Sequence, residues 1–181
     1  MDGGDRGRPS DGVSLSGAHM DTFVAWMEST AVSRAIVASR VIWPVCEIVH
    51  FIGLSLVIGI AGFFDLRLMG FMKRVPVSAA RDLMPLAIVG FLLNLTTGAT
   101  FFIGKPHQYV GNVAWWAKMF CLLLAGLNAM FFETTVGART INLGAGAETP
   151  RSAKIVGAVS LASWLGVLYW GRMLPYIGSA F

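Results

Sequence analysis

Glu47 and His50 are ionisable side chains placed three residues apart in the apolar run that starts near Ile42. This spacing puts the carboxylate and the imidazole on one face of a helix. Counting along that helix places them roughly 8 and roughly 12 Å inside a membrane. Because such burial is costly, ionisable residues within a membrane usually serve a site. We take Glu47 as a candidate catalytic residue and His50 as a candidate haem iron ligand, since imidazole is a common axial ligand.

Polar side chains on two later apolar runs reach a similar depth. Asn94 is expected about 13 Å, and Lys118 about 8 Å, from the same membrane face. An ion pair between Glu47 and Lys118 would offset the cost of burying either charge alone, which makes Lys118 the second candidate catalytic residue. In the alternative arrangement, Glu47 reaches the interface beside Trp43 while Lys118 extends to it along its methylene stem.

A haem at His50 would need space and further ligands. Gly53 lies one helical turn further on and would leave room for a flat macrocycle, and Asn94 would lie near it. The other histidines are His107, which could fold down from an outer loop, and His19 near the N-terminus. His50, Gly53, Asn94 and His107 are therefore the candidate cofactor-binding residues. The alternative for His50 is a hydrogen-bonded packing residue.

The composition is that of a membrane protein. The 181 residues are 55% hydrophobic and 13% charged, whereas soluble domains carry about 25% charged residues. The formal net charge is +4, but the basic residues flank apolar runs and form no patch with interleaved aromatics. The lipid bilayer is thus the expected partner, and nucleic acid is not.

Four runs are long enough to span a bilayer, which predicts an all-α integral membrane four-helix bundle. The predicted spans are residues 42–64, 83–103, 113–132 and 155–174, within a domain covering residues 40–181. Residues 1–19 are polar and Gly-rich, so we expect a disordered tail. Residues 20–39 have the spacing of an amphipathic interfacial helix.

Charge and small residues predict orientation and packing. The loops after the first and third spans are basic, which predicts that they are cytoplasmic in a bacterial inner membrane and that both termini are periplasmic. Asp65 and Arg67 would form a solvated or paired end of the first span. Small residues predict close helix contacts, or a homodimer face, at two ridges: Ser55/Gly59 and Ala158/Ala162/Gly166.

Three stretches resemble a family of small bacterial membrane proteins of unknown function, over about residues 40–178: WPVCEIVHFIGLSLVIGIAGFFDLRLMG, GNVAWWAKMFCLLLAGLNAMFF and ASWLGVLYWGRMLPYIG. More distantly, His50, Gly53 and Arg67 resemble the histidine, glycine and arginine of HemJ-type protoporphyrinogen oxidases and copper-resistance D membrane proteins. The run ending at Lys118 is similar to the start of a later helix in the HemJ type. By this resemblance, His50 would bind haem and Lys118 would lie near the reactive centre. The HemJ type has a second histidine where this chain reads GLNAMFF, with Asn128 as the nearest polar residue.

These observations lead to three functional hypotheses. The first is a haem b protein that transfers electrons, or carries out redox chemistry, near the outer face, with a quinone as candidate electron partner. The second is a non-catalytic accessory subunit of a larger membrane complex. The third is a small transporter in which Glu47 and His50 relay protons. The residues alone leave open whether the protein is an enzyme.

Overall fold

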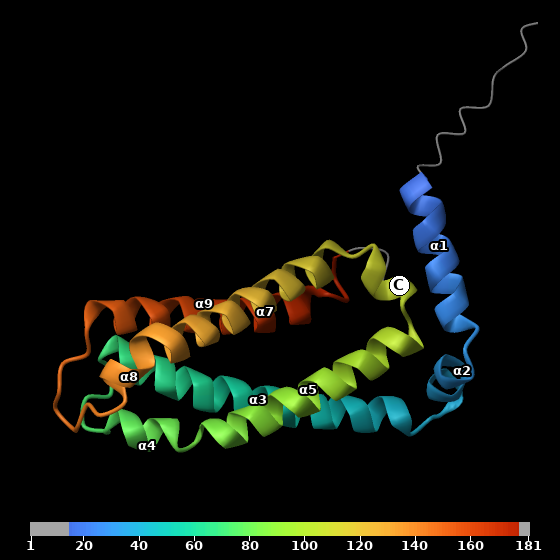
Figure 1. Ribbon diagram of the computed structural model, residues 1–181. Helices are drawn as coiled ribbons and strands as arrows, with labels where there is room; N and C mark the ends of the chain where they lie inside the picture. Colours follow the sequence, from blue (N-terminus) through green and yellow to red (C-terminus); the bar gives the residue numbers. More distant parts are fainter. Residues whose placement is uncertain (1–14, 178–181) are drawn as a thin grey trace, which may run out of the picture.

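A computed structural model describes residues 15–177, which form helices joined by short loops (Figure 1). Two helices come first, α1 (Leu15–Glu28) and α2 (Ala31–Ala38). The long helices are α3 (Ile42–Met69), α5 (Met84–Gly104), α7 (Val113–Phe131) and α9 (Arg151–Met173). The short elements are α4 (Val77–Arg81), α6 (His107–Val110), the π-helical turn (Phe132–Val136) and α8 (Gly137–Thr140).

The bundle has the surface of a membrane protein. Four segments are long and apolar enough to cross a bilayer, namely Ile42–Met69, Val77–Gly104, Val113–Thr140 and Arg151–Met173. Many of their large apolar side chains point outward, among them Phe51, Leu92, Phe120 and Leu165. Such an outer surface suits lipid as solvent. The predicted all-α, multi-pass four-helix bundle is confirmed.

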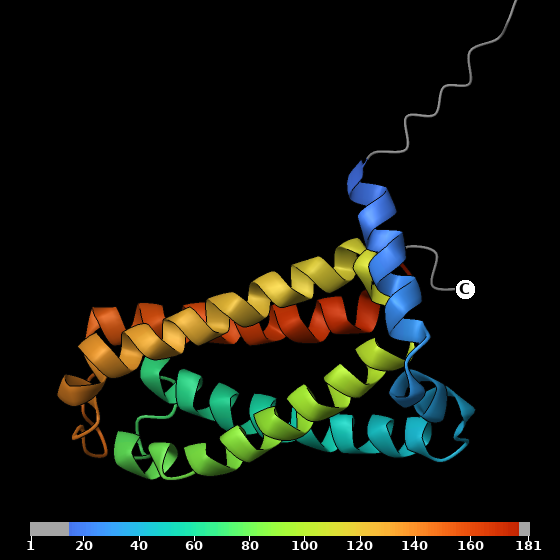
Figure 2. The same ribbon diagram turned by 45° about the vertical axis from the view of Figure 1, so that its right-hand side comes forward.

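The long helices form two pairs, with α3 beside α5 and α7 beside α9 (Figures 1 and 2). Contact between α3 and α9 joins the pairs, whereas α5 and α7 barely touch. We call one end of the bundle the basic end, because its two loops, residues 70–76 and 141–150, contain or adjoin five basic residues. These are Lys73, Arg74, Arg139, Arg151 and Lys154. The opposite aromatic end carries Trp43, Tyr109, Trp115, Trp116 and Tyr176. The two pairs diverge from the basic end toward the aromatic end.

The predicted spans match the helices best at α5 and α7, whose limits differ from the prediction by at most one residue. Helix α3 begins at the expected Ile42 but continues beyond residue 64 to Met69. It continues because its last turns are buried rather than in water, and it ends at Gly70, whose φ of 96° is left-handed. Helix α9 begins at Arg151, directly after Pro150, rather than at residue 155.

The N-terminal segment differs from the expected single helix over residues 20–39. The chain breaks between α1 and α2, where Thr30 is extended (φ −68°, ψ 148°). Its hydroxyl oxygen accepts a hydrogen bond from the backbone N–H of Ser33 at 3.2 Å, which caps α2. Helix α1 already begins at Leu15, inside the predicted tail. The rest of that tail, residues 1–14, lies outside the described residues.

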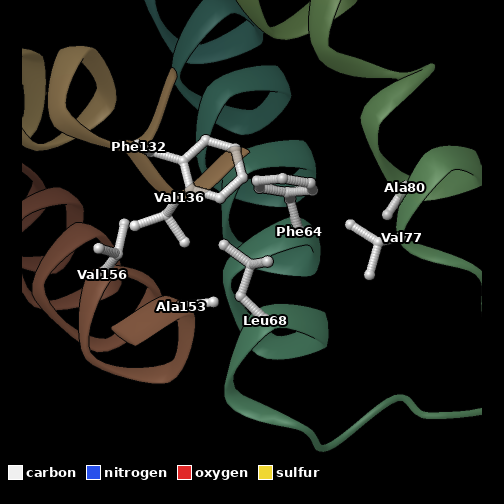
Figure 3. Close-up of a cluster of buried hydrophobic side chains, with 8 residues drawn as sticks. All are labelled: Phe64, Leu68, Val77, Ala80, Phe132, Val136, Ala153 and Val156. Atoms are coloured by element: carbon white, nitrogen blue, oxygen red, sulfur yellow. The ribbon is translucent and has the colours of Figure 1, made fainter. Parts of the chain in front are cut away.

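Buried apolar side chains gather at the basic end, where α3, α4, the π-helical turn and α9 meet (Figure 3). The rings of Phe64 and Phe132 meet edge to face with centroids 5.5 Å apart. Beside them pack Leu68, Val77, Ala80, Val136, Ala153 and Val156. This cluster holds the two helix pairs together at the basic end, and at the aromatic end Phe102 of α5 stacks on Trp115 of α7 with ring centroids 5.4 Å apart.

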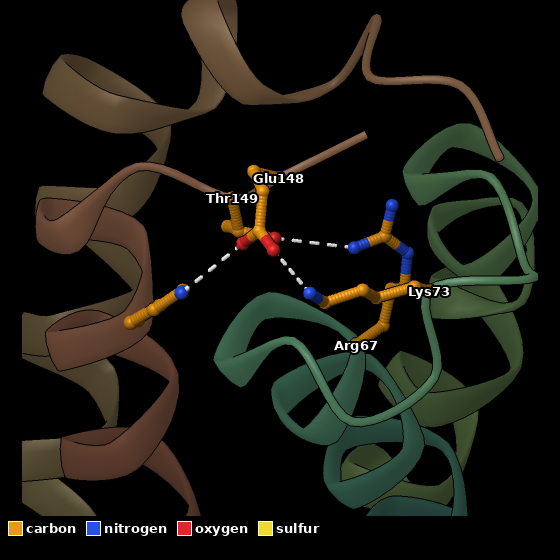
Figure 4. Close-up of polar contacts among 5 residues, drawn as sticks. Arg67, Lys73, Glu148 and Thr149 are labelled. Atoms are coloured by element: carbon orange, nitrogen blue, oxygen red, sulfur yellow. Dashed lines mark hydrogen bonds and ion pairs between the residues drawn. The ribbon is translucent and has the colours of Figure 1, made fainter. Parts of the chain in front are cut away.

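Arg67 ties the loops of the basic end together (Figure 4). Its side chain is fully buried at 0% exposure. The guanidinium donates to the carbonyl of Val75, to the hydroxyl of Thr149 at 3.1 Å and to the carbonyl of Gly144 at 3.3 Å. The prediction that Arg67 is solvated or paired with a charge is therefore wrong. The 141–150 loop folds over the side chain and supplies neutral acceptors.

Glu148 adds an exposed ionic contact to the same end. Its carboxylate pairs with Lys73, and with Lys154 at 3.3 Å. The hydrogen bonds from Lys73 and Lys154 lower its pKa below the ordinary value of 4.5.

The stability that Glu148 contributes is expected to depend on pH. With a lowered folded-state pKa, the contribution is complete above the unfolded-state pKa and is lost as pH falls from about 4.5 through the folded value. Denaturant titrations between pH 7 and pH 3 should therefore show a shallower loss of stability for Glu148→Gln than for the wild type. The difference should be small, since exposed ion pairs contribute little. Identical pH profiles would contradict a role for these contacts.

Glycines set the close approaches between helices, at positions other than the predicted ridges. A Cβ on Gly53 would lie 2.7 Å from the Gly90 carbonyl oxygen, and one on Gly90 would lie 2.8 Å from the Gly53 carbonyl oxygen. The α3–α5 crossing thus needs glycine on both sides. By contrast, Gly59 has open space around it, and Ser55 is exposed.

The contacts of α9 also differ in part from the predicted ridge. Gly166 does pack closely, since a Cβ there would lie 2.7 Å from Cys121 Sγ. Ala158 and Ala162 are exposed instead of facing another helix of the chain. The contact with α3 is made by Gly157, where a Cβ would lie 2.9 Å from the Asp65 carbonyl oxygen.

Candidate functional site

The imidazole of His50 is held by α5. Its Nδ1 lies 2.7 Å from the hydroxyl oxygen of Thr97, and that hydroxyl donates to the carbonyl of Leu93 at 2.7 Å. Because a threonine hydroxyl has one hydrogen, its lone pair faces Nδ1, so Nδ1 carries the proton. The other ring nitrogen, Nε2, is then the one with a free lone pair.

The immediate surroundings of this ring are apolar and partly open. Phe101 packs against it with ring centroids 5.6 Å apart. A Cβ on Gly98 would meet only the His50 Cε1 atom, at 3.9 Å. Gly98 on α5 thus leaves room beside the imidazole for a small group.

Gly53 does not provide the expected room for a macrocycle. Its side is closed by the Gly90 carbonyl and by the Asn94 side chain, whose Nδ2 would lie 3.1 Å from a Cβ on Gly53. Asn94 packs into the helix crossing, where its Oδ1 is buried without a hydrogen-bond partner among the described residues. Sequence alone could not reveal this, because an interior glycine can face either a ligand or another backbone.

Glu47 lies at the surface of the aromatic end. Its Oε1 accepts a hydrogen bond from the Trp43 indole N–H at 3.0 Å, and the residue is exposed. Burial, together with the negative charge of Glu47, raises the pKa of Tyr109 to about 12. Glu47 therefore belongs to an interfacial group with Trp43 and Tyr109.

Lys118 does not form the expected ion pair with Glu47. The ion pairs within residues 15–177 include none between these two side chains. The stem and ammonium group of Lys118 instead run along α9, 3.7 Å from where a Cβ on Gly171 would lie. The predicted ion pair does not form, because the hydrogen bond from Trp43 holds Glu47 toward the interface.

The other histidines do not come near His50. His107 Nδ1 lies 2.6 Å from the Glu28 carboxylate, which links α6 to α1, and its side chain is exposed. His107 therefore does not fold down onto the site in this structure, because Glu28 on α1 holds it at the surface. His19 is an exposed residue of α1. Among the described residues, His50 is thus the single histidine available to an intramembrane cofactor.

The sequence analysis missed a second polar region, centred on Asp65. This carboxyl was expected at a solvated or paired end, but the residue is 3% exposed and its Oδ2 has no hydrogen-bond partner in the described part of the chain. It lines a cavity of about 300 Å³ between the two helix pairs. Asn128 lines the same cavity, which His50 does not reach. The available signal was an acidic residue inside an apolar helix.

Comparison with known protein families, curated proteins and solved structures finds no match for this chain. The resemblance to HemJ-type and copper-resistance D proteins therefore stays a prediction. Function must be argued from the side chains themselves.

Proposed function

We propose that this is a bacterial inner-membrane protein that binds haem b through His50 and takes part in electron transfer or other redox chemistry near its aromatic end. The observation that carries the proposal is the His50–Thr97 hydrogen bond. Metal-binding histidines usually donate their second ring N–H to a fixed acceptor, which sets the tautomer and the ring orientation. Thr97 is that acceptor here.

Several neighbouring residues fit such a group, whereas the predicted Gly53, Asn94 and His107 do not. Gly98 leaves space beside the ring and Phe101 supplies an apolar wall. Lys118 on α7, which lies along α9 beside Gly171, would provide a positive charge for a carboxylate of the bound group. Gly53 contributes packing only. Bound haem b would supply a one-electron iron couple, whose potential depends on ligation, burial and nearby charge.

We orient the protein by the charges at its two ends. The loops of the basic end carry Lys73, Arg74, Arg139, Arg151 and Lys154. By the positive-inside rule, this end faces the cytoplasm. The aromatic end, with His50 nearer to it, then faces the periplasm, and α1 lies on that side. A membrane quinone is the proposed electron partner.

Haem binding is tested on protein purified in detergent from haem-replete cells. The wild type is expected to show a Soret band and a reduced-minus-oxidised difference spectrum, and His50→Ala is expected to lose both. Thr97→Val should retain haem about 10- to 100-fold less tightly, because it removes the acceptor that orients the ring. His107→Ala is the control and should keep the wild-type spectrum. A wild type without a Soret band, or full haem content in His50→Ala, would overturn the proposal.

Helix α1 favours the accessory-subunit role as a second candidate. It projects from the bundle (Figure 1) and exposes Phe23 and Trp26 at 42% and 62%. A partner subunit packed on this face would bury both side chains. Replacing Phe23 and Trp26 with serine should then abolish co-purification with larger subunits, while retained co-purification in the double variant would count against this role.

A further inference from the structure

We infer that the cavity containing Asp65 binds a small lipophilic amine in its protonated form, which enters from the bilayer between α5 and α7. This inference is independent of haem binding at His50, since His50 does not line the cavity.

The cavity has the size and lining of a small-ligand site. It measures about 300 Å³, at the lower end of the range of ligand pockets. All four long helices contribute to its walls. Aromatic side chains are prominent among the lining residues: Phe64, Phe91, Phe132 and Trp164. Aromatic faces attract organic cations as well as apolar groups.

Besides the Ser160 hydroxyl, which can donate or accept, the polar atoms of the lining that are free to bind a ligand are hydrogen-bond acceptors. Asp65 Oδ2 has no partner among the described residues. Asn128 uses its Nδ2 to donate to the Val156 carbonyl at 3.1 Å, which leaves its Oδ1 as an acceptor. A ligand for these atoms must therefore bring the hydrogens.

The charges around the cavity favour a cation over a neutral donor. The basic residue in the lining, Arg81, is paired with Glu133 at 2.7 Å. Arg67 is nearby in sequence, but its guanidinium bonds to the two loops, and it forms no ion pair with Asp65 within the described chain. A buried carboxylate without a cation is costly. A protonated amine would supply both the charge and the N–H donors.

The open side of the cavity faces lipid. Ile88 on α5 and Gly126 and Ala129 on α7 line the cavity and are also exposed on the bundle surface. Because α5 and α7 barely contact each other, this side is not closed by helix packing. The ligand should therefore be one that partitions into the membrane first.

The test uses wild-type protein in nanodiscs and tritiated amantadine, a compact cage amine, with empty nanodiscs subtracted. We expect saturable binding that falls at least tenfold in Asp65→Asn and is retained in Glu148→Gln, a carboxyl of the basic end that does not line the cavity. Gly126→Leu should also abolish binding, because the added side chain would occupy the mouth of the cavity. The variant should still fold, because a Cβ at Gly126 meets no atom within 4 Å. Equal binding by the wild type and Asp65→Asn would overturn the proposal, as would absence of saturable binding. Equal affinity for neutral adamantanol would overturn the cationic assignment.

A chemical readout on the wild type does not depend on any variant folding. Because a buried carboxylate without a cation is costly, we expect Asp65 to be protonated while the cavity is empty. Dicyclohexylcarbodiimide, an apolar reagent, adds to protonated carboxyls and should then label Asp65, as read by mass spectrometry of the peptide. Amantadine should protect this carboxyl, because its ammonium group holds Asp65 in the ionised form. Labelling of Asp65 that amantadine does not change would contradict occupation of the cavity by the amine.

Discussion

Replacing Arg67 with methionine is expected to lower the free energy of unfolding by about 3–5 kcal/mol, the range typical of breaking a buried charged contact. The guanidinium is completely buried and donates to acceptors from both loops of the basic end. Methionine fills much of the volume but leaves all three acceptors without the guanidinium, and the buried Thr149 hydroxyl, left unsatisfied, alone costs about 1–3 kcal/mol. The loops would then separate from the end of α3.

The measurement is unfolding in mixed micelles, followed by far-ultraviolet circular dichroism. Arg67→Lys should be intermediate, because an ammonium keeps the charge but cannot span the acceptors as a planar fork does. Arg74→Met is the matched control, since Arg74 is an exposed arginine in the same loop, and it should change stability by less than about 0.5 kcal/mol. A similar small effect for Arg67→Met would show that the buried network does not stabilise the fold.

Gly90→Leu is expected to force α3 and α5 apart and to cost about 3 kcal/mol or more, at the upper end of overpacking effects. A Cβ at this position would lie 2.8 Å from the Gly53 carbonyl oxygen and 2.8 Å from Leu56 Cβ. Both contacts involve atoms that cannot rotate away. The separation should also weaken the His50–Thr97 hydrogen bond, because the two residues lie one to two turns from this crossing on their helices.

Gly59→Leu is the control for this prediction. Gly59 is also within α3, but a Cβ there meets no atom within 4 Å. Its substitution should leave the unfolding midpoint nearly unchanged or slightly raised, since leucine is the better helix former. Equal effects of the two substitutions would mean that the glycine crossing does not set the distance between α3 and α5.

Apolar run length and proline position were enough to predict the spans, because bilayer thickness and backbone hydrogen bonding leave few alternatives. Residue types were a poorer guide to burial, because Glu47 is exposed whereas Asp65 and Arg67 are buried. What they could not predict was the partner of each polar group. Glu47 and Lys118 lie at similar depth, yet the rotation of each helix about its axis turns Glu47 toward Trp43 and Lys118 toward Gly171.

Asp65 and Arg67 illustrate the same limit in another way. Two residues apart on a helix, they point in different directions, one into the cavity and the other into the loops. Their burial depends on the approach of α9 through Gly157 and on the path of the 141–150 loop. The local sequence around Asp65 indicates neither the approach of α9 nor the path of this loop. On its own, that sequence is typical of the polar end of a span.

The bonds of Arg67 also bear on how the protein is made. Two of its acceptors lie 77 and 82 residues further along the chain. A ribosome delivers α3 to the membrane well before it has produced those acceptors, so the nascent protein carries a guanidinium whose final partners do not yet exist. The first helix pair must therefore wait in an incomplete state, and only synthesis of the segment before α9 completes it.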